Sequence, residues 1–215
     1  MPCNCCEITD NAFSEAEAKS ELKNYRKRGP AEQTKLLLTA IRSLNLKNAD
    51  LLDIGGGVGV IHHELLKDVA RAATHVDASS AYLKEAKEEA ARRGHSDRVN
   101  FIHADFTDIA SELPKVDLVT LDRVVCCYPD FRRLLKAAAD HSRRALAFTY
   151  PRETWYIRFG LRIINFFQGL RKDPFRVFLH PIAEMDSLLK REGFERVALR
   201  RLFVWEMALY QRTMS

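Results

Sequence analysis

The sequence predicts an α/β protein with a doubly wound, mostly parallel sheet. Between residues 49 and 150, short apolar runs alternate with amphipathic helical segments, which is the pattern of consecutive βαβ units. A glycine-rich segment, 51–60, follows the first apolar run and precedes the first of these helices. The chain has 215 residues and 47% hydrophobic content, which favours one domain with a sizeable core.

Two helices are expected ahead of the sheet. Residues 13–28 are rich in helix formers and stop at a Gly-Pro pair. Residues 31–45 place apolar side chains at helical spacing, so they form the second helix. We therefore divide the chain into an N-terminal part, 1–45, with a cysteine cluster and cap helices, and a main domain, 46–215. The two parts are expected to make one globular unit.

The next elements alternate between strands and helices. Five apolar runs are typical of strands: ADLLDI, ATHVD, RVNFIHAD, KVDLVTLD and RALAFTY. Helices are expected between them, in VIHHELLKDVA, SSAYLKEAKEEAARR, a short segment near 106–112, and 131–140. A final helix over 181–192 leads into strands near 194–204 and 204–212. We expect the crossovers between parallel strands to be right-handed.

Residues 155–170 predict an amphipathic helix inserted late in the sheet. Its apolar stripe consists of Tyr156, Phe159, Ile163, Phe166, Phe167 and Leu170. Three uses fit this helix: a lid over an apolar acceptor, a helix that contacts a membrane surface peripherally, or ordinary core packing.

Four glycines fall within five positions of LLDIGGGVGV: Gly55, Gly56, Gly57 and Gly59. Glycines here let the backbone turn tightly and approach a ligand, and the following helix offers free N–H groups. A dinucleotide-binding loop requires G-x-G-x-x-G, and this segment misses that spacing from either Gly55 or Gly57. The spacing therefore argues against NAD, and an NAD-dependent oxidoreductase is kept as the alternative.

Acidic residues end the next two strands. Asp77 lies about 20 residues past the loop, where an acid can accept hydrogen bonds from ribose hydroxyls. Asp105 ends the third strand. Either residue could instead cap the helix that follows it, because aspartate is a favoured N-cap. Since the carboxyl ends of parallel strands converge on one crevice, the loop and the two acids together favour cofactor binding.

The segment from Asp53 to Gly59 resembles the E/D-x-G-x-G-x-G motif of class I S-adenosylmethionine-dependent methyltransferases, and the resemblance spans residues 49–150. It implies a Rossmann-like sheet of seven strands, S-adenosylmethionine as the methyl donor and S-adenosylhomocysteine as the product. An acid at position 53 suits the cationic methionine end, and in that family the acid at position 105 contacts the adenine amino group. The residues expected at the cofactor are Asp53, Gly55, Gly56, Gly57, Gly59, Asp77, Ala78, Asp105, Phe106, Leu121 and Asp122.

Four further segments look like the magnesium-protoporphyrin O-methyltransferase group: YRKRG, LDRVVCCYPD, RALAFTYP and RVFLHPIAEMDSLLKREGF. Those enzymes methylate a carboxylate on a large flat tetrapyrrole. The resemblance implies that N-terminal helices cover the cofactor and that Tyr25 lines the active site. Because Cys127 stands where that group has a histidine, we expect more broadly a small apolar or aromatic acceptor, with O-methylation favoured.

Three residues are candidates for the acceptor side of the site. Cys127 and Tyr128 follow the fourth strand, and we expect both to line the acceptor pocket, with Cys126 packed in the core. A disulfide between the adjacent cysteines would be strained, and nothing in the sequence lowers the pKa of either thiol. His180 could act as a base or orient the acceptor, and the alternative is a surface histidine before a proline turn.

The N-terminal cysteines, Cys3, Cys5 and Cys6, offer thiolates that could bind zinc. A structural zinc site usually has four ligands in spaced pairs, and only three thiols are present, so we expect no metal. The alternatives are packing as small apolar residues, a flexible segment, or thiols that approach Cys126 and Cys127 at the opening of the active site. The histidines other than His180 fall in predicted core elements and receive no role.

Composition limits the expected partners. The net charge is +5, basic residues are interleaved with acidic ones, and no nucleic-acid motif is present. The Asn-Pro-Pro-Tyr signature of amino methyltransferases that act on nucleic acids is also absent. No apolar run reaches the roughly 18 residues of a membrane span, and no signal peptide is visible, so we expect a cytoplasmic protein. A non-catalytic module that binds S-adenosylmethionine is the remaining alternative.

Overall fold

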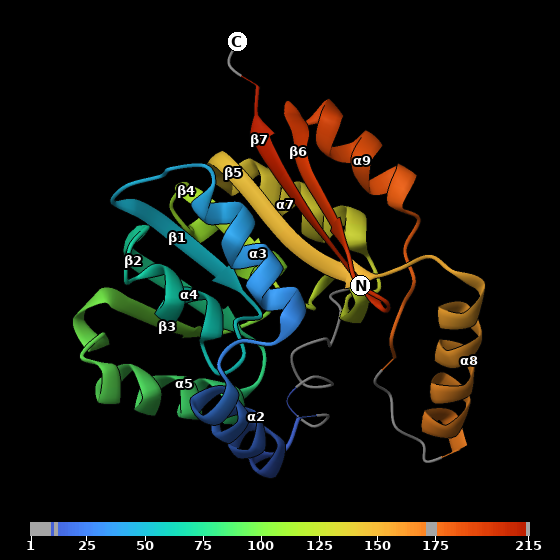
Figure 1. Cartoon of the computed structure of the whole chain (residues 1–215), viewed down its shortest axis with the longest axis horizontal. Helices are drawn as coiled ribbons and strands as arrows, with labels where there is room; N and C mark the ends of the chain where they lie inside the picture. Colours follow the sequence, from blue (N-terminus) through green and yellow to red (C-terminus); the bar gives the residue numbers. More distant parts are fainter. Residues whose placement is uncertain (1–9, 11–12, 171–175, 214–215) are drawn as a thin grey trace.

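Figure 1 shows the computed structural model, which describes residue 10, residues 13–170 and residues 176–213. The expected thiol cluster at Cys3, Cys5 and Cys6 lies outside the described residues.

Within the described residues, seven strands form one sheet in the order β3-β2-β1-β4-β5-β7-β6. β7 runs antiparallel to its neighbours β5 and β6, and the other pairs are parallel. The expected doubly wound, mostly parallel sheet is confirmed. Its strand order reverses between β1 and β4, where open α/β sheets bind ligands at the carboxyl ends of the strands. The strands are β1 (Ala49–Ile54), β2 (Ala70–Asp77), β3 (Val99–His103), β4 (Val116–Leu121), β5 (Ser142–Pro151), β6 (Phe194–Arg201) and β7 (Trp205–Arg212).

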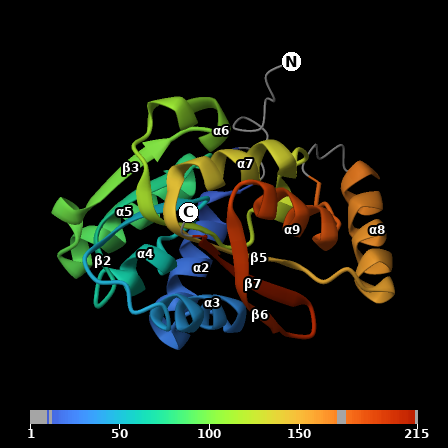
Figure 2. The same cartoon turned by 90° about the horizontal axis from the view of Figure 1, so that it is seen from above.

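Helices cover both faces of the sheet, as Figure 2 shows from above. One face carries α3 (Glu32–Arg42) and α4 (Val60–Leu65), and the other carries α7 (Phe131–His141) and α9 (Ile182–Arg191). Successive strand residues point to opposite faces, so each face has its own core. Leu51 and Leu118 pack with α3 and α4, whereas Leu52 and Val119 pack with α7 and α9. The remaining short elements are α6 (Phe106–Ile109) and single turns at Ser96–Arg98, Ala110–Glu112 and Val125–Cys127.

The N-terminal helix α2 (Glu15–Arg28) packs against α5 (Ser80–Arg93). Ser14 caps α2 reciprocally: its side chain accepts from the Glu17 amide at 3.3 Å, and its own amide donates to the Glu17 carboxylate at 2.8 Å. The helix ends at Gly29, where φ is 76°. The expected helix over 13–28 is therefore present, two residues shorter at its start.

The late amphipathic helix α8 (Trp155–Leu170) lies apart from both helical layers in Figures 1 and 2. Its expected apolar stripe does not form one buried side. Phe159, Ile163, Phe166 and Leu170 are exposed, and the side chain of Phe167 is outside the described residues. The helix is apolar on more than one side, so periodicity alone does not identify the side that packs against the rest of the chain. Within the described part of the chain, no helix is long and apolar enough to cross a membrane.

Candidate active site

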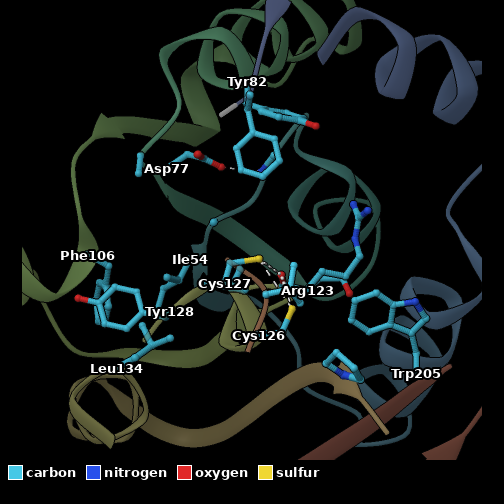
Figure 3. Close-up of a pocket in the computed structure, with 18 of the residues that line it drawn as sticks. Ile54, Asp77, Tyr82, Phe106, Arg123, Cys126, Cys127, Tyr128, Leu134 and Trp205 are labelled. Atoms are coloured by element: carbon cyan, nitrogen blue, oxygen red, sulfur yellow. Dashed lines mark hydrogen bonds between the residues drawn. The ribbon is translucent and has the colours of Figure 1, made fainter. Parts of the chain in front are cut away.

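A cavity of about 560 Å³ opens at the carboxyl ends of β1 to β4, beside the reversal of strand order. Small-molecule sites typically have volumes of roughly 300–1,000 Å³. Figure 3 shows Phe106, Tyr128 and Leu134 at one end of the cavity and Arg123 and Trp205 at the other. The cavity therefore joins two chemically distinct ends.

The glycine loop forms one wall. Gly55 and Gly57 line the cavity and have φ values of 60° and 56°, which side-chain-bearing residues rarely adopt. A Cβ on Gly55 would lie 2.5 Å from Val124 Cγ2, so space also restricts this position to glycine. The Gly55 amide donates to the Val76 carbonyl at 2.7 Å, which fixes the loop to the end of β2.

Two backbone amides hold the carboxylate of Asp77 at the wall of the cavity. The Gly57 amide donates to Asp77 Oδ2 at 2.8 Å, and the Ser79 amide donates to Asp77 Oδ1 at 2.8 Å. Asp77 and the following Ala78 both line the cavity. The carboxylate is thus oriented before any ligand binds, and its remaining lone pairs are available to hydroxyl donors.

Asp105 is both a helix cap and a cavity residue. Its Oδ1 accepts from the Thr107 amide at 2.8 Å at the start of α6, and Tyr128 donates its hydroxyl to Asp105 Oδ2 at 3.1 Å. Burial raises the pKa of Tyr128 to about 12, so the hydroxyl remains a donor. Capping and ligand binding, posed as alternatives for this acid, are compatible here. Phe106 follows it and presents an aromatic ring to the cavity.

Asp122 joins the site to the N-terminal helices. Thr34 of α3 and Thr149 of β5 both donate hydroxyls to its carboxylate at 2.5 Å. Burial raises the pKa of Asp122, while the two hydroxyls and the charge of Arg123 oppose that shift. Asp122 lines the cavity at the end of β4.

Arg123 adopts a positive φ of 63°, and its amide donates to Thr149 Oγ1 at 2.8 Å. Its guanidinium donates to Glu21 of α2 at 2.5 Å, and Tyr82 donates to the same carboxylate at 2.9 Å. Although burial works against the charge, the carboxylates of Glu21 and Asp122 raise the pKa of Arg123. No local sequence pattern indicates this pair, because Glu21 and Arg123 meet only through the tertiary fold.

Cys126 and Cys127 both line the cavity, and their sulfur atoms lie 3.8 Å apart. Both thiols are free, and the Arg123 carbonyl oxygen lies within hydrogen-bond distance of each, 3.4 Å from Cys126 Sγ and 3.5 Å from Cys127 Sγ. The hydrogen bond from Cys126 lowers the pKa of Cys127, burial opposes that shift, and the charge of Arg123 adds to it. The sequence shows no sign of this lowered pKa, because its cause is the turn that places both sulfur atoms beside each other and near Arg123. Cys126 is buried as expected, yet it also lines the cavity.

The second end of the cavity is apolar. Trp205 of β7 lies there with residues of α8 that recur at helical spacing: Ile157, Gly160, Leu161 and Ile164. Tyr156 also lines this end, donates its hydroxyl to the Phe203 carbonyl at 3.2 Å, and stacks on the Phe203 ring. α8 is therefore attached to the turn between β6 and β7 while one side of it covers the cavity.

Four residues expected at the cofactor do not line the cavity: Asp53, Gly56, Gly59 and Leu121. Asp53 is fully buried on the same strand face as Leu51, so its carboxyl points toward α4 and not out of the strand end. It accepts from Thr120 Oγ1 at 2.8 Å and lies 3.2 Å from His62 Nδ1. Burial raises the pKa of Asp53 to about 6. Leu121 is a fully buried core residue.

Tyr25 also lies away from the cavity. Its hydroxyl donates to Glu64 of α4 at 2.7 Å, and the Arg93 guanidinium sits 4.7 Å from the ring centre. The residue of α2 that reaches the cavity is Glu21, one turn earlier. The implied active-site role for Tyr25 is not supported by this geometry, because α4 and α5 enclose its ring.

His180 does not line the cavity either. Its Nε2 lies 2.9 Å from the Tyr128 carbonyl, and its ring is 4.6 Å from that of Phe131. Burial lowers the pKa of His180. This arrangement suits a half-buried histidine that holds the segment after α8 against the Tyr128 turn, and its role as a base stays a prediction.

The sequence profile described as a methyltransferase domain matches residues 51–145. No curated protein matches the chain in sequence. Magnesium protoporphyrin IX methyltransferase from Synechocystis PCC 6803 with bound SAH superposes with a TM-score of 0.74 at 18% identity, over 98% of this chain and 100% of that one. The same enzyme with bound SAM gives a TM-score of 0.72 at 17% identity, over 98% of each chain.

Two other solved structures show how far the fold extends. An O-methyltransferase family 2 protein from Planctomyces limnophilus DSM 3776, in complex with apigenin, has a TM-score of 0.60 at 16% identity, over 86% of this chain and 63% of that one. The [4+2]-cyclase SpnF has a TM-score of 0.63 at 15% identity, over 85% of this chain and 80% of that one.

At these identities the superpositions establish the fold, and the presence of a cyclase among them shows that the fold alone does not fix a reaction. The profile match is independent of the superpositions and covers β1 to the start of β5, including the glycine loop. Residues 51–145 thus match a methyltransferase-domain profile, and the chain adopts the Rossmann-like fold of the superposed methyltransferase structures.

Proposed function

We propose that this chain transfers a methyl group from S-adenosylmethionine to an oxygen of a small apolar or aromatic acceptor. The observation that carries the proposal is the continuity of the cavity: the glycine-loop end and the apolar end covered by α8 belong to one space of about 560 Å³.

The residues at the first end suit the donor. Gly55 and Gly57 expose backbone to the cavity, and Asp77 offers an oriented carboxylate for ribose hydroxyls. Asp105 and the Phe106 ring suit an adenine amino group and its flat face. S-adenosylmethionine, when bound, supplies a methyl group on a positively charged sulfur. Asp122 lies at the end of β4, between this end and the cysteine turn, and its carboxylate suits the cationic end of the donor.

The second end suits a flat apolar acceptor. Trp205, Ile157, Leu161 and Ile164 supply apolar surface, and Arg123 is the one cation among the described lining residues. Such a lining excludes water and favours hydrophobic ligands that carry few polar groups. Resemblance to the magnesium protoporphyrin IX enzyme supports a flat acceptor, at the level of fold.

The polar groups of the site favour an acceptor oxygen that is already ionised. His180 is turned to the Tyr128 carbonyl, and the Tyr128 hydroxyl is committed to Asp105 and Thr107. A carboxylate needs no proton removed, whereas a phenol would need a base. We therefore propose a carboxylate on the acceptor, with positioning as the main contribution of the protein to the rate.

A transfer assay with methyl-labelled S-adenosylmethionine tests the proposal. We expect the labelled methyl group to be transferred to aromatic or polycyclic carboxylic acids. The corresponding methyl esters should receive no label, because they have no free carboxylate. A Leu161→Asp variant should lose transfer while retaining S-adenosylhomocysteine binding, because it alters only the acceptor end. Transfer to phenols but to no carboxylate would refute the acceptor assignment. Absence of S-adenosylhomocysteine binding would refute the function itself.

A further inference from the structure

A closed cluster of nitrogen and oxygen donors lies behind the glycine loop, outside the cavity. Asp53 of β1, His62 of α4 and His75 of β2 are each fully buried. His62 Nδ1 lies 3.2 Å from Asp53 Oδ2 and 3.2 Å from His75 Nδ1. One donor atom from each residue lies within 4.8 Å of the other two. Three elements that are separate in the sequence thus bring three potential metal ligands to one point.

Hydrogen bonds alone do not satisfy this cluster. A neutral imidazole carries one hydrogen, and His62 Nδ1 faces two partners at equal distance. If both rings carry that hydrogen on Nε2, lone pairs on His62 Nδ1, His75 Nδ1 and Asp53 Oδ2 face one another. If His62 carries it on Nδ1, its own Nε2 lone pair is buried without a donor. The Nε2 atoms of His62 and His75 have no hydrogen-bond partner among the described residues, so every tautomer leaves buried polar atoms unpaired.

The glycine loop lies against these donors and places no side chain among them. A Cβ built on Gly56 would lie 2.7 Å from Asp53 Oδ2 and 2.9 Å from His75 Nδ1, so no side chain fills the position between them. In tetrahedral zinc sites with bonds near 2.0–2.1 Å, neighbouring ligand atoms lie roughly 3.3 Å apart. The two 3.2 Å separations at His62 Nδ1 match that spacing.

We propose that Asp53, His62 and His75 bind one divalent transition-metal ion, of the class that prefers imidazole ligands and includes Zn²⁺. Two imidazoles favour Zn²⁺, Co²⁺ or Ni²⁺ over Mg²⁺ and Ca²⁺, which take oxygen ligands. The Asp53 carboxylate offsets part of the ionic charge, which a buried site requires. The inference does not depend on the proposed function.

Such an ion would hold the underside of the glycine loop. It would join β1, β2 and the start of α4, and Gly55 to Gly59 connect β1 to α4. His75 Nε2 lies 3.9 Å from Asp77 Oδ2, on the side of the ring opposite the cluster's Nδ1. Ligating histidines commonly direct their second nitrogen to a carboxylate, and the 3.9 Å here is an electrostatic contact longer than a hydrogen bond. Asp77 in turn accepts the Gly57 amide, so the ion would be linked to the cavity wall through His75.

Equilibrium dialysis of the full chain against Zn²⁺ tests the site, with Cys3, Cys5 and Cys6 replaced by serine so that N-terminal thiolates cannot bind the ion. We expect one Zn²⁺ per chain. His62→Gln and His75→Asn should each lower the affinity by about tenfold or more. His63→Gln is the matched control, because His63 is a buried neighbour on the same helix that lies outside the three donors, and it should retain the ion. Retention by all variants, or loss in the His63 control alone, would overturn the ligand assignment.

A second measurement needs no substitution of a buried residue. In ¹⁵N spectra of the histidine rings of the triple-serine chain, Zn²⁺ should shift two Nδ1 resonances and leave both Nε2 atoms protonated. Co²⁺ in place of Zn²⁺ should give visible absorption bands without a thiolate charge-transfer band. No ring shift at saturating Zn²⁺, or no bound ion after dialysis, contradicts the proposal.

Discussion

The backbone amide of Gly57 donates a 2.8 Å hydrogen bond to the carboxylate of Asp77. This bond joins the glycine loop after β1 to the end of β2. The carboxylate oriented toward the cavity is therefore the same group that holds the loop in place. Loss of Asp77 should affect the shape of the site as well as its ligand contacts.

Asp77→Ala should weaken S-adenosylhomocysteine binding by about ten- to a hundredfold, because a hydrogen bond to a charged group contributes about 1.5–3 kcal/mol. Titration calorimetry measures the change. Asp97→Ala is the control, because Asp97 is exposed in a surface turn and should leave affinity unchanged. Equal affinities for wild type and Asp77→Ala would contradict the assignment of this acid.

Gly55→Ala should lower the free energy of unfolding through two separable effects. A left-handed backbone costs a side-chain-bearing residue about 1–2 kcal/mol, and the clash with Val124 adds to that cost. Gly94→Ala should show only the cost of the left-handed backbone, because Gly94 has φ 70° and a Cβ added there would meet nothing within 4 Å. Urea denaturation should therefore show a larger loss for Gly55→Ala than for Gly94→Ala.

The double variant Gly55→Ala/Val124→Ala isolates the clash. Removing the Val124 methyl groups leaves Val124 Cβ as the nearest atom of that residue, at 3.5 Å. The two substitutions should be less destabilising together than the sum of their separate effects. Strict additivity would mean that the contact with Val124 does not restrict position 55.

Tyr128→Phe and Tyr25→Phe should differ, although both remove one hydroxyl. Tyr128→Phe takes a hydrogen bond from Asp105 at the cavity, so KM for S-adenosylmethionine should rise several-fold with little change in kcat. Tyr25→Phe breaks a bond to Glu64 outside the cavity and should cost about 1 kcal/mol of stability without changing that KM. A raised KM in Tyr25→Phe alone would restore Tyr25 to the active site.

Cys127 should react with iodoacetamide at lower pH than an ordinary thiol. Its pKa is lowered, first by the hydrogen bond from Cys126 and further by Arg123, so the reactive thiolate appears as pH rises through a value below the usual one. Cys126→Ala should shift the rate profile to higher pH. Peptide mapping by mass spectrometry separates Cys127 from the other thiols. The reverse order of reaction, with Cys126 modified before Cys127, would contradict this assignment.

Features that depend on local sequence and strand topology could be predicted. The spacing of the glycines required a tight loop after β1, and Asp77 and Asp105 converge because parallel strands end at one edge of the sheet. The methyltransferase fold and the seven-stranded sheet followed from the same segment. These predictions needed no knowledge of contacts between distant elements.

Features that depend on which side of an element is buried could not be predicted. α8 is apolar on more than one side, and only its attachment near Phe203 turns Leu161 and Ile164 to the cavity. Tyr25 was assigned to the site by resemblance, but its partner Glu64 lies 39 residues away. The cluster of Asp53, His62 and His75 likewise joins three separate elements, and no one segment carries its pattern.

Calorimetric titration of the full chain with S-adenosylhomocysteine, alongside NAD⁺, tests the central claim most directly. The cavity and its oriented acids predict saturable binding of one S-adenosylhomocysteine per chain, weakened in Asp77→Ala, and no heat from NAD⁺. Binding of NAD⁺ with no binding of S-adenosylhomocysteine would contradict the claim.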